Sequence, residues 1–135
     1  MSIENKIIID LYCGAYGLTL IIIINEIDEL FFFKALINKL YEGNTKEISM
    51  SEYREFKITG ISDIVLTAYQ GKHPEIIAVN DKIHLLGTKD TWEDWGYLID
   101  SLIEDGSGGH QYLEGYFYSK NSITIELSYK ENLNP

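Results

Sequence analysis

The residues that most often perform chemistry in proteins are few in this chain, and their spacing does not suit a catalytic or metal-binding site. The three histidines are His73, His84 and His110, and no two have the i, i+4 spacing that places two imidazoles on one helix face. Cys13, the single cysteine, falls where a strand meets a glycine turn, at a position shared with apolar residues, which indicates a buried thiol. No hydrolase motif is present. We therefore expect no enzyme, no metal and no cofactor.

A glycine-rich loop, Gly106-Ser107-Gly108-Gly109-His110, has the composition of a phosphate-binding loop but not its context. Phosphate loops precede a helix, so that free backbone N–H groups and the positive end of the helix dipole face the anion. This loop follows a predicted helix, lies at its negative end, and lacks the P-loop lysine. Termination of the helix explains the loop better than phosphate binding does.

The most distinctive chemical feature is a run of carboxylates that no basic residue interrupts. Seven acidic residues, and no lysine or arginine, occur between Asp90 and Glu114. On a helix with its tryptophans inward, spacings of four, three and four create one outward stripe: Glu93, Tyr97, Asp100 and Glu104. A second row beside it contains Asp94, Ser101 and Asp105.

Local helix stability does not explain this pattern, because like charges four residues apart destabilise a helix and carboxylates at its C-terminal end oppose the dipole. A cationic partner would explain it. Tyrosine is a residue type that anchors interfaces, and surrounding carboxylates accelerate encounter and set specificity. We therefore predict a partner-binding surface with these residues: Glu93, Asp94, Tyr97, Asp100, Glu104, Asp105, Tyr112 and Glu114.

Composition limits the class of partner. The chain has 135 residues, of which 21 are acidic and 11 basic, giving a formal net charge of −10. Such a surface repels phosphate backbones and anionic membranes, which argues against nucleic acid or membrane as the partner and favours a basic protein. The single cysteine is typical of a reducing compartment. Because no signal peptide is recognisable and no apolar run approaches the roughly 20 residues that cross a bilayer, we expect a cytoplasmic protein. The oligomeric state stays open.

Hydrophobic periodicity predicts the elements that must position these residues. Two helices are expected, one capped by Asn25 and ending before Gly43, and one beginning near Asp90 and ending at Gly106. Alternating or continuous apolar segments predict these strands: 6–13, 18–24, 52–59, 63–69, 75–79, 82–86, a short 116–118 and 122–129. The short turns between them favour an α+β fold over residues 1–135 as a single domain. Its mainly antiparallel sheet would have about five to seven strands, with two helices packed on one face.

Residues 90–130 combine a tryptophan-bearing acidic helix, the segment GGHQYLE at 108–114 and the strand ITIELSY at 123–129. In size, acidity and arrangement this half of the chain resembles small bacterial immunity proteins of polymorphic-toxin and contact-dependent inhibition systems. The resemblance implies a cytoplasmic inhibitor that binds its cognate toxin tightly. Many such toxins are basic nucleases, which would account for the acidic face.

Three functions are thus in competition. The leading hypothesis is an immunity-type inhibitor that neutralises a basic protein toxin through the acidic helix face. The second is a small-ligand-binding or enzymatic domain, which needs a concave pocket near the Gly106–His110 loop, lined by Tyr112 and Tyr116. The third is an acidic mimic of nucleic acid, which needs an extended stripe of carboxylates with few apolar anchors.

Overall fold

The computed structural model describes residues 7–14, 17–117 and 123–130, and within these ranges the chain forms nine strands and two α-helices. The strands are β1 (Ile7–Gly14), β2 (Gly17–Ile24), β3 (Glu47–Ser49), β4 (Phe56–Thr59), β5 (Asp63–Ala68), β6 (Glu75–Val79), β7 (Lys82–Gly87), β8 (Gly109–Tyr112) and β9 (Ile123–Tyr129). The helices are α1 (Ile27–Tyr41) and α2 (Lys89–Asp105), with two short 3₁₀ helices, η1 (Met50–Glu52) and η2 (Glu114–Tyr116).

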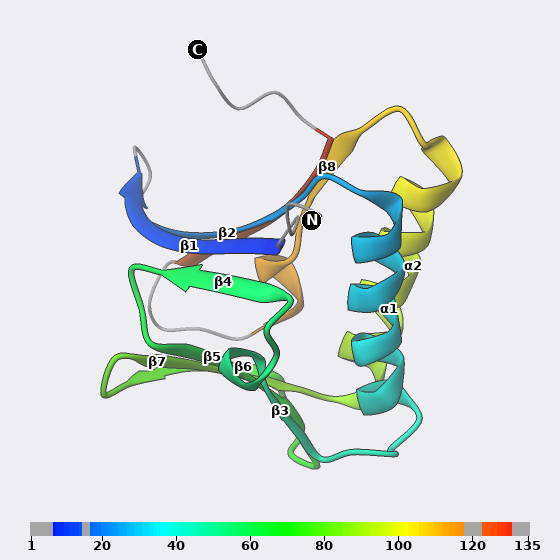
Figure 1. Ribbon diagram of the computed structural model, residues 1–135. Coiled ribbons are helices and arrows are strands. Elements are labelled where there is room, and N and C mark those ends of the chain that lie inside the picture. The colour runs from blue at the N-terminus through cyan, green and yellow to red at the C-terminus, as the bar shows by residue number, and fades with distance from the viewer. Residues whose placement is uncertain (1–6, 15–16, 118–122, 131–135) are drawn as a thin grey trace.

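The strands form two sheets that face each other across the core (Figure 1). One sheet has five strands in the order β4-β1-β2-β9-β8, and the other has four in the order β3-β5-β7-β6. Among the described residues, four strand pairs are antiparallel and three are parallel. The parallel pair β2–β9 joins the two ends of the chain, with Leu20 opposite Ile125.

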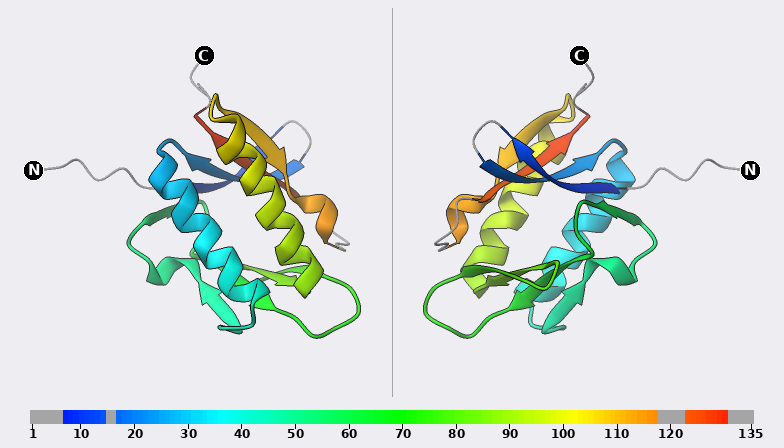
Figure 2. Two further views of the ribbon diagram at one scale, coloured as in Figure 1. Left: turned by 90° about the vertical axis from the view of Figure 1, so that its right-hand side faces the viewer. Right: turned by 90° about the vertical axis from the view of Figure 1, so that its left-hand side faces the viewer.

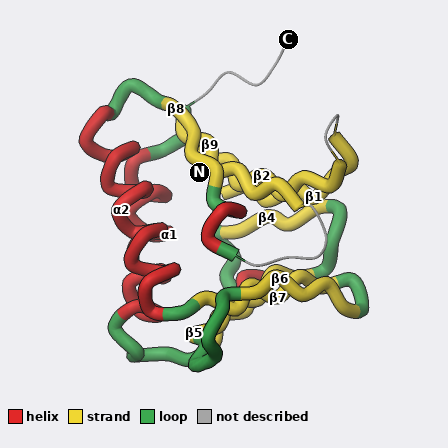
Figure 3. Tube along the Cα trace, turned by 180° about the vertical axis from the view of Figure 1, so that it is seen from behind, coloured by secondary structure: helices red, strands yellow, loops and turns green. Residues whose placement is uncertain are grey.

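The α+β class and both helices are therefore confirmed, but the strands are divided between two sheets where one was expected. The helices accordingly do not cover one face of a single sheet. They stand side by side at one end of the molecule (Figure 2), and the view from behind shows that they run from one sheet to the other (Figure 3). This arrangement follows from burial: each sheet turns one apolar face inward, and the helix pair closes the open side between them.

One hydrophobic cluster fills the space between these layers. Side chains that are almost completely buried reach it from every layer: Ile9, Leu20 and Ile125 from the five-stranded sheet, Ile64 and Leu85 from the four-stranded sheet, and Phe33 and Trp95 from the helices. The alternation predicted for β9 is confirmed on its apolar side, because Ile123, Ile125, Leu127 and Tyr129 are all buried.

Local predictions fail where tertiary hydrogen bonds replace the strand pattern. The predicted strand 52–59 is shortened to β4, because η1 occupies the chain up to Glu52. The buried carboxylate of Asp63 holds η1 in place by accepting hydrogen bonds from the Ser49 hydroxyl and from the Ser51 N–H, the latter at 2.9 Å. The start of the predicted strand 116–118 is in η2 at Tyr116, and residue 118 lies outside the described residues. Cys13 is exposed and not buried as expected.

Capping residues set where each helix begins. The carboxylate of Glu29 accepts the N–H groups of Asn25 and Glu26, each at 3.2 Å, so the cap of α1 is Glu26, one residue later than predicted. Thr88 caps α2 by accepting the N–H of Thr91 at 3.4 Å. None of the described helices has the length and hydropathy needed to cross a membrane.

Candidate functional site

The two helices pack antiparallel and present one side of the pair to solvent (Figure 2). We call this side the helix-pair face and define it by these residues: Phe31, Lys34 and Tyr41 from α1, and Glu93, Tyr97, Asp100 and Glu104 from α2. Lys34 forms an ion pair with Asp100, which marks the side on which the helices meet at the surface. Phe31 and Tyr97 are each three residues from a member of that pair, so they share its side of their helices.

Two aromatic side chains dominate the exposed apolar surface of this face. Tyr97 is 61% exposed, and Phe31 is 52% exposed. The helices are stabilised by a different set of side chains, since Trp95 and Phe33 are completely buried beneath them and their ring centroids lie 6.4 Å apart. Burial of Phe31 and Tyr97 is therefore not part of what holds the helices together, and both are available to a partner.

The predicted acidic stripe is partly neutralised. Lys34, 66 residues from Asp100 in the sequence, supplies its positive charge in the middle of the stripe. The expectation of uncompensated charge is therefore wrong at Asp100. Among the described residues, no ion pair is formed by Glu93 or Glu104 of the same stripe. The negative charge of the helix-pair face consequently lies toward its two ends.

At one end of this face, Glu93 of α2 changes the pKa of Tyr41 on the neighbouring helix α1. A hydrogen bond with the Glu93 carboxylate, followed by the charge of that group, raises the pKa of the Tyr41 hydroxyl above its ordinary value of 10.0. Asp90 adds a smaller effect of the same sign. The Lys89 ammonium lies 5.2 Å from the centroid of the Tyr41 ring, within the range of a cation–π contact. This end of the face is thus negative and already receives one cation.

Asp94 and Asp105 lie on the row of α2 next to the helix-pair face, on the side away from α1. Each follows by one position a residue of the helix-pair face, and successive helical residues point about 100° apart. Glu93 contacts α1 through Tyr41, so Asp94 is turned away from that contact. Partial burial is the main cause of a raised pKa at Asp94, and the neighbouring charges of Glu93 and Asp90 raise it further.

The raised pKa of Asp94 predicts a pH-dependent stability effect. The folded state binds this proton more tightly than the unfolded chain, whose carboxyl titrates near 3.8, so ionisation of Asp94 above that pH disfavours folding. We expect Asp94→Asn to increase the free energy of unfolding at neutral pH and to have less effect as the pH approaches 3.8. Urea denaturation as a function of pH measures this. Glu52→Gln, at an exposed site on η1, should show no such gain, and an equal gain there would contradict the assignment.

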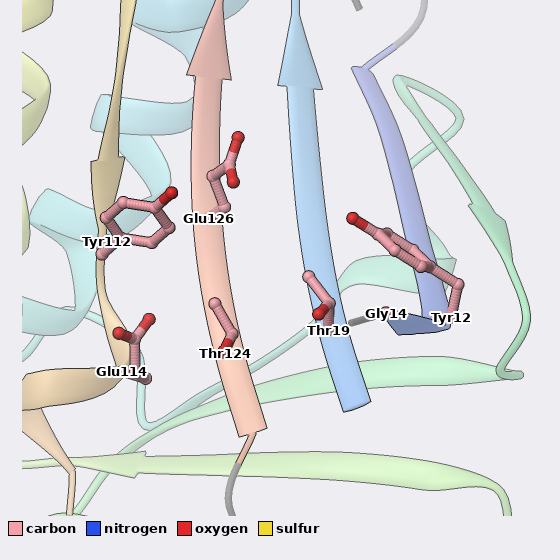
Figure 4. Close-up of a pocket in the computed structure, with 7 residues that line it drawn as sticks. All are labelled: Tyr12, Gly14, Thr19, Tyr112, Glu114, Thr124 and Glu126. Carbon is pink, nitrogen blue, oxygen red and sulfur yellow. The ribbon is translucent and has the colours of Figure 1, made fainter. Parts of the chain in front are cut away.

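Tyr112 and Glu114 do not extend the helix-pair face. Tyr112 is opposite Glu126 in the β8–β9 register, on the side of the five-stranded sheet that faces away from the core (Figure 4). The carboxylate of Glu114 accepts the N–H of Ile125 at 2.8 Å and thereby holds η2 against β9. The eight residues predicted as one surface are thus divided between the helix pair and the sheet.

Tyr112 and Glu114 instead line an open cavity of about 420 Å³ on this outer sheet face (Figure 4). Sequence reasoning did not identify the other residues that line it: Tyr12, Gly14, Thr19, Thr124 and Glu126. Strand alternation directs Thr124 and Glu126 to the face opposite Ile123 and Ile125, and it directs Tyr12 to the face opposite Ile7 and Ile9. What it lacked was the pairing of β2 with β9, which brings these outward positions together.

The second hypothesis required a pocket beside the glycine loop that Tyr112 and Tyr116 line, and the cavity matches it at Tyr112 alone. Neither Tyr116 nor any residue of the Gly106–His110 loop lines the cavity, although the His110 ring lies 5.2 Å from that of Tyr112, centroid to centroid.

Within the described ranges, no three histidine, cysteine, aspartate or glutamate side chains group as metal ligands. No protein-family model, curated protein or solved structure matches the chain.

Proposed function

We propose that this protein is an immunity-type inhibitor that binds and neutralises a basic protein toxin through the helix-pair face. The observation that carries the proposal is the pairing of two largely exposed aromatic side chains, Tyr97 and Phe31, with carboxylates at both ends of the same face. Aromatic anchors with a charged surround are what a tight protein interface uses for affinity and for orientation, respectively.

The charges of this face suit a basic partner. Glu93 and Glu104 form no ion pair within the described residues, and Asp90 extends the acidic end. The whole chain carries a formal charge of −10, which adds long-range attraction for a cationic protein. The Lys34–Asp100 pair would fix the register of docking more than it adds affinity, because its two charges already neutralise each other. In a bacterial cell such an inhibitor would act in the cytoplasm.

The same features disfavour a mimic of nucleic acid. A mimic needs carboxylates spaced along an extended stripe with few apolar anchors. Here Lys34 interrupts the stripe at its centre, and Phe31 and Tyr97 stand on either side of the interruption. A protein interface with aromatic anchors accounts for Phe31, Tyr97 and the Lys34–Asp100 ion pair together.

The test is neutralisation of a captured partner. The wild-type chain is used to capture its partner from cells of its source, and the partner is then expressed with and without the chain. We expect the partner to be basic and its toxicity to be suppressed by the wild type. Phe31→Ala combined with Tyr97→Ala should weaken binding by about tenfold or more, since interface aromatics are frequent hot spots. Glu93→Lys with Glu104→Lys should slow association and reduce its dependence on salt.

Two controls make the result specific. Glu52→Lys reverses a charge at an exposed site on η1, outside the helix-pair face, and should leave binding close to that of the wild type. Thermal unfolding of each variant checks that the fold is intact. Wild-type protection by the combined Phe31 and Tyr97 variant would reject the helix-pair face as the docking surface.

A further inference from the structure

The cavity on the outer face of the five-stranded sheet has a chemistry that the helix-pair face does not share. Seven residues line it, and none of them is basic: Tyr12, Gly14, Thr19, Tyr112, Glu114, Thr124 and Glu126. Two are carboxylates, and Glu126 forms no ion pair within the described part of the chain. The lining therefore repels anions and attracts a cation.

Strand register places these groups in a compact array. Tyr12 of β1 is opposite Thr19 of β2, and Thr19 is opposite Thr124 of β9, so three side chains form a row across the sheet. Glu126 is two residues beyond Thr124 on the same strand face, about 7 Å away. Tyr112 lies opposite Glu126 on β8. Figure 4 shows the Tyr12 hydroxyl directed from β1 toward β2, over this row.

Thr19 supplies a buried acceptor at the base of the array. Its side chain lines the cavity although the residue is only 8% exposed. The hydroxyl donates to the Gly17 carbonyl at 3.5 Å, and among the described residues no donor is directed at its oxygen. Because no described residue donates to this buried oxygen, its capacity to accept a hydrogen bond is unused. This favours a ligand that carries hydrogen-bond donors.

We infer that this cavity receives the guanidinium group of an arginine side chain from a protein partner. A guanidinium has five N–H donors and a delocalised charge, which match the Glu126 carboxylate, the Thr19 oxygen and the π face of Tyr12. The open mouth favours a side chain presented by a larger molecule, because sites for free small ligands usually enclose most of the ligand surface. No residue of the helix-pair face lines the cavity, so the inference goes beyond the proposed function and does not depend on it.

Titration by NMR tests the inference with defined probes. The probe is the blocked tripeptide acetyl-Gly-Arg-Gly-amide, and the control is the same peptide with citrulline, which keeps the shape but lacks the charge. We expect saturable amide shifts at Thr19, Thr124 and Glu126 with the arginine peptide and about tenfold weaker binding of the citrulline peptide, because a charge-assisted hydrogen bond is lost.

Variants locate the site and separate it from the helix pair. Glu126→Gln, which keeps the side-chain shape, should weaken binding of the arginine peptide about tenfold, and Tyr12→Leu should also weaken it. Glu104→Gln, on the helix-pair face, should leave the peptide titration unchanged. Equal binding of the two peptides, or unchanged binding by Glu126→Gln, would overturn the inference. Tighter binding of propylguanidinium than of the peptide would also overturn it, by assigning the cavity to a free small cation.

Discussion

Replacement of Trp92 by alanine is expected to lower the free energy of unfolding by about 3–5 kcal/mol, as large aromatic-to-alanine changes in cores do. The indole is completely buried, and its ring centroid lies 5.1 Å from that of Trp95 and 6.1 Å from that of Phe117. Its Nε1–H donates to the Thr67 carbonyl at 3.2 Å, which ties α2 to the four-stranded sheet. The substitution removes this packing and leaves the carbonyl of Thr67 without that donor.

Urea denaturation followed by circular dichroism measures this loss, because tryptophan fluorescence would itself change. Tyr97→Ala is the matched control on the same helix, since Tyr97 is largely exposed and should change stability by no more than about 0.5 kcal/mol. Domains of this size have total stabilities of about 5–15 kcal/mol, so the Trp92 variant should be severely weakened. A loss no larger than that of the control would mean that the indole is not part of the core.

Gly60→Ala is expected to destabilise the protein by about 3 kcal/mol, although Gly60 is exposed. Its φ of +81° is unfavourable for a residue with a side chain. A Cβ atom at this position would also lie 2.1 Å from the backbone oxygen of Leu11, which belongs to β1 and cannot move aside as a flexible side chain would. The two penalties add, and the second would push the β4–β5 connection away from β1.

Gly43→Ala separates the two penalties. Gly43 has almost the same φ, +78°, but a Cβ there would meet no atom within 4 Å. We therefore expect Gly43→Ala to cost about 1 kcal/mol, the backbone contribution alone. The difference between the two variants, measured by urea denaturation, reports the contact with Leu11. Equal losses would contradict a steric role for that contact.

The two proposed binding surfaces have different relations to the core. On α2, Trp92 and Trp95 point inward while Tyr97 points outward, so the helix-pair face can be altered without removing core packing. On the five-stranded sheet, Thr19 lines the cavity, is itself almost completely buried, and directly precedes the core residue Leu20. The floor of the cavity is therefore part of the packed structure. Substitutions on the helix pair should therefore test binding more cleanly than substitutions at Thr19.

Several elements were predictable because they depend on neighbours in the sequence. Asn80-Asp81 is a two-residue hairpin signal between the predicted strands 75–79 and 82–86, and in the β6–β7 hairpin both residues have positive φ angles, as a type I′ turn requires. The buried stripe of α2 followed from the spacing of Trp92, Trp95, Ile99 and Leu102. The exposure of Phe31 is also indicated by the sequence, because Phe31 falls outside the apolar stripe of α1 that is buried.

Sequence alone determined the charge, the two helices, most of the strands and the apolar face of β9, because these depend on composition and on periods of 2 and 3.6 residues. Only the tertiary structure decided that the strands form two sheets, that Lys34 neutralises Asp100, and that Tyr12, Tyr112 and Glu126 meet around one cavity. The physical reason is that strand pairing and ion pairing join residues far apart in the chain. Periodicity says which way a side chain points, but it carries no information about which segment lies beside it.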